Sequence, residues 1–166
     1  MKRALVTSAA ILPLAAFAAS SPDSSFYKKA AESSLAEVAL GNLAQQKASN
    51  SSVKEFGAMM VKDHTATNEK LMPIAASKGI DLPTSPSLGD QATEGKLKLL
   101  SGETFDKSYI KGMIKDHRAD IKEFQKEIKS GQDQEAKAFA TATLPTLKMH
   151  LKKAESIAAQ AGIKED

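Results

Sequence analysis

The chain of 166 residues contains no cysteine and no tryptophan, and aromatic residues make up only 5% of it. Because there is no cysteine, no disulfide framework can stabilise the fold and no lipid can be attached through a thiol. Nucleic-acid binding requires a concentrated basic face, ideally with aromatic side chains between the basic ones. The shortage of aromatic residues therefore argues against nucleic acid as a partner.

Charge of one sign is not concentrated anywhere in the chain. The sequence has 23 lysine and arginine residues against 20 aspartate and glutamate residues, and the two kinds are interspersed without long runs of like charge. Such a pattern is typical of the solvated faces of helices. No basic patch for nucleic acid is expected.

The first 20 residues have the pattern of a secretory signal peptide. Lys2 and Arg3 precede an apolar run that is too short to cross a membrane and that ends in small residues. Ala16-Phe17-Ala18 is the expected cleavage motif, which places the cut near residues 18–20. We therefore expect a periplasmic or secreted bacterial protein whose mature part, 21–166, is one domain without a transmembrane segment.

Apolar residues recur three and four positions apart through most of the mature chain, which predicts an all-α fold. The expected long helices cover about residues 25–48, 52–78, 105–130 and 134–161. Ser52 and Glu55 have the spacing of a capping box at the start of the second helix. Residues 79–104 form a long crossover that contains a short amphipathic segment, 88–100.

One long crossover between the second and third of four helices is typical of a ferritin-like four-helix bundle, in which those two helices run parallel. An up-down-up-down bundle with a small fifth helix is the alternative. We predict the ferritin-like arrangement, with segment 88–100 covering the end of the bundle.

The three histidines of the chain all lie on the apolar stripes of predicted helices. The sequence MMVKDHTATNEKL at 59–71 is echoed by GMIKDHRADIKEF at 112–124, so His64 and His117 share one apolar frame. His150 lies on the stripe of the last helix, and Glu37 lies at the corresponding place on the first. Since all four residues are near the middle of their helices, a narrow bundle brings them into one layer.

Burying three imidazoles and a carboxylate is costly unless the groups are paired. Three neutral imidazoles with one carboxylate match the four-coordinate preference of zinc, and they also suit copper or iron. We therefore predict a site for one divalent transition-metal ion. Its expected ligands are Glu37, His64, His117 and His150.

Five further side chains could surround such a site. Asp63 and Asp116 each precede a histidine by one residue and point away from the core stripe, so each could accept the second N–H of a histidine on a neighbouring helix. Asp120 lies one turn beyond Asp116 and has the same ambiguity. Met60 and Met113 each lie one turn before a histidine and could offer thioether ligands to copper, although methionine at this spacing usually fills a core.

The segments that carry these residues resemble the bacterial exported family called domain of unknown function 4142. The similarity covers about 26–161, in motifs such as VKDHTATNEKL, IKDHRADIKEF and FATATLPTLKMHLKKAE. The resemblance implies a ferritin-like fold and no particular activity. Ferritin-like di-iron proteins use Glu-x-x-His motifs, whereas Val61, Ile114 and Leu147 stand three residues before the histidines here, so no di-iron centre is expected.

We predict an exported helical bundle that binds one transition-metal ion and serves in metal handling or envelope stress. The alternative is a non-enzymatic envelope interaction or structural module. In it, the buried layer is a hydrogen-bond network in which protonated histidines pair with Glu37 and with Asp63 or Asp116. No nucleophile with an adjacent base and no glycine-rich phosphate loop is discernible, so we predict no catalytic residues. A third alternative is a small oxidoreductase with a mononuclear metal, in which Glu37 is a base and not a ligand. The sequence identifies no protein partner.

Overall fold

The computed structural model describes residues 22–164, which form five α-helices and no strand. The helices are α1 (Pro22–Lys47), α2 (Ser51–Ser77), α3 (Leu88–Lys98), α4 (Gly102–Ser130) and α5 (Gln134–Gln160). The predicted all-α class is confirmed. The predicted signal peptide, residues 1–20, lies outside the described residues. Within 22–164, no helix has the length and apolar character that crossing a membrane requires.

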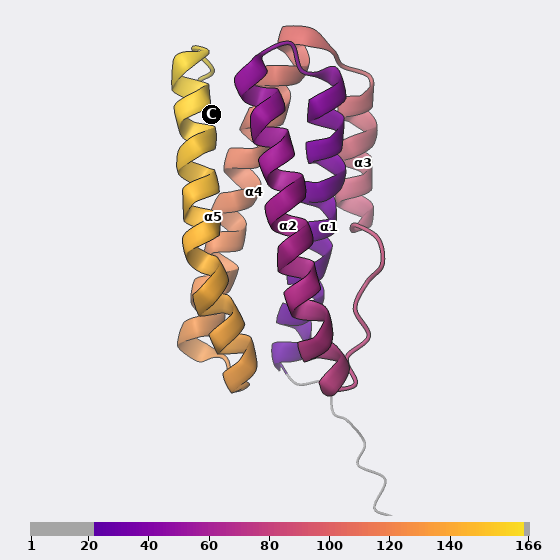
Figure 1. Ribbon diagram of the computed structural model, residues 1–166, viewed down its shortest axis with the longest axis vertical. Helices are drawn as coiled ribbons and strands as arrows, with labels where there is room; N and C mark the ends of the chain where they lie inside the picture. The colour runs from indigo at the N-terminus through magenta and orange to yellow at the C-terminus, as the bar shows by residue number, and fades with distance from the viewer. Residues whose placement is uncertain (1–21, 165–166) are drawn as a thin grey trace, which may run out of the picture.

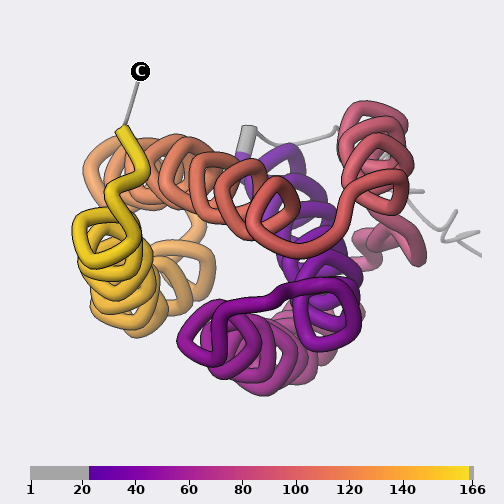
Figure 2. The backbone as a smooth tube through the Cα atoms, turned by 90° about the horizontal axis from the view of Figure 1, so that it is seen from above, coloured from indigo at the N-terminus to yellow at the C-terminus, as the bar shows by residue number. Residues whose placement is uncertain are grey.

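The four long helices lie side by side along the long axis of the molecule (Figure 1). α1 and α2 form one hairpin and α4 and α5 form another, and the hairpins meet through α1 against α4 and α2 against α5 (Figure 2). Both α2 and α4 begin at the end of the molecule where α1 and α5 finish. α2 and α4 therefore run in the same direction.

The short helix α3 does not cover the end of the bundle, so that prediction is wrong. It lies along the side of the molecule, against α1 and α4 (Figures 1 and 2). The crossover has to return from the end of α2 to the start of α4 at the opposite end of the molecule. Because α3 is part of this crossover, it lies along the side of the bundle. Leu97 is buried against the bundle, whereas Leu88 and Leu99 remain exposed.

The N-termini of α2 and α4 differ from the prediction. Asn50 caps α2, because its side-chain oxygen accepts a hydrogen bond from the Ser52 N–H at 2.8 Å. Ser52 is thus already inside the first turn, and the predicted capping box of Ser52 with Glu55 is wrong. α4 begins at Gly102, earlier than the predicted residue 105. Gly102 has a φ of 58°, a left-handed conformation that glycine adopts without the usual steric penalty.

α1 and α2 approach each other closely where two glycines face each other. A Cβ atom on Gly41 would lie 2.6 Å from the Gly57 carbonyl oxygen, and one on Gly57 would lie 2.7 Å from the Gly41 carbonyl oxygen. Both neighbours are backbone atoms, so a side-chain movement could not relieve either contact. Glycine at these two positions therefore sets the separation of the first hairpin.

We expect Gly57→Ala to destabilise the protein by about 2 kcal/mol, because the added methyl group forces the two backbones apart. The melting temperature should fall by about 4–8 °C for a chain of this size. Gly112→Ala in α4 is the matched control, since a Cβ there meets no atom within 4 Å. That control should keep or raise the melting temperature, because alanine has the higher helix propensity. A Gly57→Ala protein as stable as the wild type would contradict the close approach.

Two buried aspartates, each near the start of a helix, form hydrogen bonds with the turn of the other hairpin. Asp106, at the start of α4, accepts hydrogen bonds from the backbone N–H groups of Ser49 and Asn50 at 3.1 and 3.0 Å, and from the Ser49 hydroxyl at 2.5 Å. Asp23, at the start of α1, accepts from the N–H groups of Gln132 and Asp133 at 3.2 and 2.8 Å. Each aspartate thus satisfies backbone donors that a short turn leaves unpaired.

A second carboxyl group lies beside Asp23. Glu127, on α4, is buried near Asp23. Burial, and then the neighbouring Asp23, raise the pKa of Glu127 to about 7. Since an unfolded glutamate titrates near 4.3, the folded protein binds an extra proton between these two pH values. This contribution to stability is present below the unfolded pKa and is lost as the pH rises through 7.

Glu127→Gln should therefore raise the melting temperature at pH 8, where the wild-type carboxyl group is charged beside Asp23. We expect a gain of about 1–2 kcal/mol there and a clearly smaller one at pH 5, because the folded carboxyl group is then protonated and glutamine resembles the protonated acid. Thermal melts of both proteins at the two pH values measure this difference. Glu69→Gln, at an exposed position on α2, serves as the control. A gain of equal size at both pH values would contradict the assignment.

Candidate metal centre

A polar layer divides the core of the bundle into two apolar clusters. Met60, Met113 and Ala154 belong to one cluster, and Leu71 and Phe124 belong to the other. Along each helix, the ionisable residue of the predicted stripe falls between members of the two clusters. The residues of this layer are Glu37 on α1, His64 on α2, His117 on α4 and His150 on α5.

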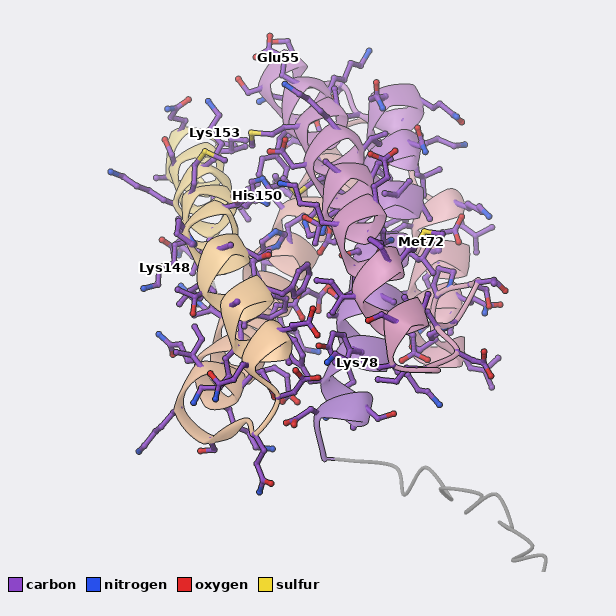
Figure 3. The ribbon with its side chains drawn as sticks, turned by 60° about the horizontal axis from the view of Figure 1, so that its bottom comes forward. Glu55, Met72, Lys78, Lys148, His150 and Lys153 are labelled. Atoms are coloured by element: carbon purple, nitrogen blue, oxygen red, sulfur yellow. The ribbon has the colours of Figure 1, made fainter. Side chains whose placement is uncertain are left out.

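The three histidines come together inside this layer. Their exposed fractions are 2% for His64 and 0% for His117 and His150. One ring nitrogen of each histidine lies within 4.8 Å of one ring nitrogen of each of the others. Figure 3 shows His150 between α5 and the neighbouring α2. The three side chains could together hold one metal ion.

In two of the histidines, one ring nitrogen contacts a hydrogen-bond acceptor. We call this the outer nitrogen, and the other ring nitrogen the inner one. Nδ1 of His117 lies 2.9 Å from the carbonyl oxygen of Met113, one turn earlier on α4. Nε2 of His150 lies 2.9 Å from Oδ2 of Asp63 on α2. A carbonyl and a carboxylate can only accept, so both outer nitrogens carry the ring hydrogen. In a neutral imidazole the other nitrogen then has only a lone pair.

The inner nitrogens of these two rings therefore face each other without a hydrogen between them. Nε2 of His117 and Nδ1 of His150 are 3.4 Å apart. Zinc binds imidazole nitrogens at 2.0–2.1 Å in a tetrahedron, whose ligands are then about 3.3–3.4 Å from one another. The observed separation matches the edge of that tetrahedron.

His64 supplies a third inner nitrogen. Its Nε2 is buried and has no hydrogen-bond partner, while its Nδ1 lies 3.4 Å from the Ser34 hydroxyl oxygen. Placing the ring hydrogen on Nε2 would bury a donor without an acceptor, so the hydrogen belongs on Nδ1. The layer thus contains three buried imidazole lone pairs, in rings that each place one nitrogen within 4.8 Å of a nitrogen of the others.

All three imidazoles are held in the neutral form. Burial, followed by the repulsion of His117 and His150, lowers the pKa of His64 well below its usual value. Burial and the neighbouring His150 lower the pKa of His117 to about 4. Burial also lowers the pKa of His150, although its hydrogen bond with Asp63 opposes this. A metal ion would therefore not have to displace protons from these rings at neutral pH.

Glu37 is not brought into the group of three nitrogens. Its Oε1 lies 3.6 Å from Nδ1 of His117, which is the outer nitrogen of that ring, and its Oε2 has no hydrogen-bond partner. Burial, and then Asp120 and Asp116, raise the pKa of Glu37 well above its usual value. A fourth ligand would come from Glu37 after a movement of its side chain, or from water.

The other predicted residues take different places around the layer. Asp63 contacts His150, as described above, whereas Asp116 and Asp120 line a separate cavity. Asp120 accepts a hydrogen bond from the Ser33 hydroxyl at 2.5 Å. Met60 and Met113 are buried in the apolar cluster above the layer. It is the carbonyl oxygen of Met113 that contacts His117.

The cavity lined by Asp116 and Asp120 was not predicted. It lies between α1, α3 and α4 and has a volume of about 300 Å³. Asp116, Asp120 and Glu123 on α4 share one helix face at steps of four and three, which was a usable signal. The contribution of α3 depended on the path of the crossover, which the sequence did not reveal.

Comparison with known proteins identifies the family. The family model described as Domain of unknown function (DUF4142) matches residues 10–157. The chain belongs to the DUF4142 family. None of the curated proteins compared with the chain matches it. The resemblance inferred from the motifs is thereby confirmed.

The fold of this DUF4142 protein is shared with a solved structure from another family. The crystal structure of a DUF305 protein from Streptomyces coelicolor, described as secreted, superposes with a TM-score of 0.76 at 14% sequence identity. The match covers 90% of this chain and 99% of the other. At so low an identity the similarity concerns the fold alone.

Proposed function

We propose that this DUF4142 protein is an exported, ferritin-like helical bundle that binds one divalent transition-metal ion at His64, His117 and His150. The observation that carries the proposal is that one ring nitrogen of each buried histidine lies within 4.8 Å of one ring nitrogen of each of the others, while Nε2 of His64 has no hydrogen-bond partner. Buried lone pairs without donors are costly unless a cation or a donor meets them. A metal ion would satisfy all three at once.

The donor set indicates the class of metal. Imidazole nitrogens suit zinc, copper, iron and nickel, whereas magnesium and calcium prefer oxygen ligands. The chain has no cysteine, so thiolates do not compete for the ion. Asp63 would orient His150 through its outer N–H, as carboxylates commonly do beside metal-bound histidines.

The direction of the helices supports the ferritin-like assignment. α2 and α4 run the same way, and a single long crossover joins them, as in bundles of that type. The pattern of the first 20 residues supports export. A small exported protein with a buried metal site fits a role in metal handling, where the ion is held without being exposed to solvent.

Metal analysis of the full chain tests this function. Protein purified without an affinity tag, stripped and then dialysed against Zn²⁺, should retain one ion per chain, and a His64→Leu variant should retain none. If the wild-type protein retains no metal, the layer is a hydrogen-bond network in which His117 and His150 share a proton across their 3.4 Å gap. The function would then be that of a non-enzymatic interaction or structural module in the envelope.

A further inference from the structure

The buried histidines need a path by which an ion can reach them. None of the three is more than 2% exposed, and apolar side chains fill the bundle above and below their layer. The cavity between α1, α3 and α4 reaches inward to Glu37, which is itself 2% exposed and forms part of the lining. This cavity therefore extends from the side of the molecule to the edge of the histidine layer.

Acidic side chains dominate the charged part of the lining. Six carboxylate residues and one lysine contribute to it: Glu32, Glu37, Asp90, Asp116, Asp120, Glu123 and Lys29. Lys29 forms an ion pair with Glu123 at 3.2 Å, so its charge is already compensated. A concave surface lined by one sign of charge concentrates counter-ions and accelerates their binding by about 10- to 1,000-fold.

Glu37 connects the cavity to the histidines. One of its carboxylate oxygens lies 3.6 Å from His117, and the other is buried and has no hydrogen-bond partner. A buried carboxyl oxygen without a partner is unsatisfied, and a cation that replaces the carboxyl proton would satisfy it. This side chain thus contacts the edge of the histidine layer and lines the acidic cavity at the same time.

We propose that the acidic cavity is the port through which a divalent transition-metal cation reaches the centre, with Glu37 passing the ion from the cavity to the histidines. The inference rests on the proposed function, since it assumes that the histidines bind the ion. It also gives the crossover a role, because α3 forms the outer wall and contributes Asp90. Asp63, on the other side of the centre, is less suited to pass an ion inward, because its Oδ2 already contacts Nε2 of His150 at 2.9 Å.

The rate of metal loading tests the port. Metal-free full-length protein is mixed with Co²⁺ in a stopped-flow instrument, and the visible absorption of the bound ion is followed. Neutralising two port residues in the double variant Asp116→Asn/Asp120→Asn should slow loading about tenfold. Its equilibrium affinity should change much less, because a port speeds entry and release together.

A control variant separates the port from the overall charge. Glu55→Gln/Glu69→Gln removes two exposed charges from α2, outside the cavity, and should load at the wild-type rate. Loading of the wild type should also slow as NaCl is added, because the screening length falls to about 3 Å at 1 M. The salt dependence of the wild-type loading rate tests the port even if the double variant fails to fold.

The outcomes distinguish the two proposals. If the wild type binds Co²⁺ and the double variant loads as fast as the wild type, the port is overturned and the three-histidine centre stands. A wild-type loading rate that does not depend on salt would also overturn the port. If the wild type binds no Co²⁺ at all, the proposed function fails, and the port fails with it.

Discussion

Zinc should raise the melting temperature of the wild-type protein by about 8–16 °C. A ligand that binds only the folded state at 1,000 times its Kd adds about 4 kcal/mol, and each kcal/mol shifts a chain of this size by about 2–4 °C. The effect should be large because three neutral rings already face one another inside the layer. Differential scanning fluorimetry with and without Zn²⁺ measures this shift.

The shift should disappear in His64→Leu, which removes one of the three converging nitrogens. The matched control is Met113→Leu, which removes a neighbouring thioether but keeps the backbone carbonyl that holds His117. That control should retain the full zinc shift. If it lost the shift while His64→Leu kept it, sulfur would be the ligand and the three-histidine assignment would be wrong.

The stability of the metal-free variant separates a binding site from a structural network. Nε2 of His64 has no hydrogen-bond partner, and Nδ1 has only a long contact with Ser34. Replacing His64 with leucine therefore removes little stabilising interaction. Replacing a poorly satisfied buried polar group with an apolar one of similar shape is nearly neutral or stabilising. We expect metal-free His64→Leu to be as stable as the metal-free wild type. A loss of about 3 kcal/mol or more would instead indicate a network in which His64 is essential.

The sequence predicted the polar layer because that layer depends only on helix periodicity and length. His64, His117 and His150 lie on apolar stripes near the middle of their helices, and four packed helices leave little room to separate them. Asp63, one residue from the stripe of α2, was a candidate acceptor for the outer N–H of a histidine on another helix. The structure places it 2.9 Å from His150.

The sequence did not determine where Glu37 points. Its depth along α1 follows from the helical rise, but its approach to the inner or outer nitrogen of His117 depends on the rotation of α1 about its axis. The contact of Gly41 with Gly57 holds α1 close to α2 and contributes to that rotation. Such close approaches depend on which faces meet and are not encoded in the period of either helix alone.

The contacts of Asp106 and Asp23 were also missed, because their partners are distant in the chain. Each aspartate lies three residues before a buried aromatic side chain, Phe26 or Tyr109, and so shares its inward face. An aspartate on a core stripe one turn before an aromatic residue was therefore a signal for a buried acceptor. It could not indicate which turn would supply the donors.

Asp106→Ala should destabilise the protein by about 3 kcal/mol and lower the melting temperature by about 6–12 °C. The substitution removes the acceptor of two backbone N–H groups and of the Ser49 hydroxyl, in a place where Asp106 is only 5% exposed. Hydrogen bonds to a charged group are stronger than neutral ones, and the orphaned donors keep their desolvation penalty. Asp106→Asn retains one acceptor oxygen, so its melting temperature should lie between those of the wild type and Asp106→Ala.

Asp81→Ala is the control for this substitution, because Asp81 is exposed in the crossover, and its melting temperature should be unchanged. The zinc shift should persist in Asp106→Ala, since Asp106 fastens the helix ends whereas the histidines are in the middle of the bundle. Separate sites contribute additively to stability when they share no partners. A combined loss of stability and zinc response would mean that the turn held by Asp106 also sets the register of His64 on α2 against His117 on α4.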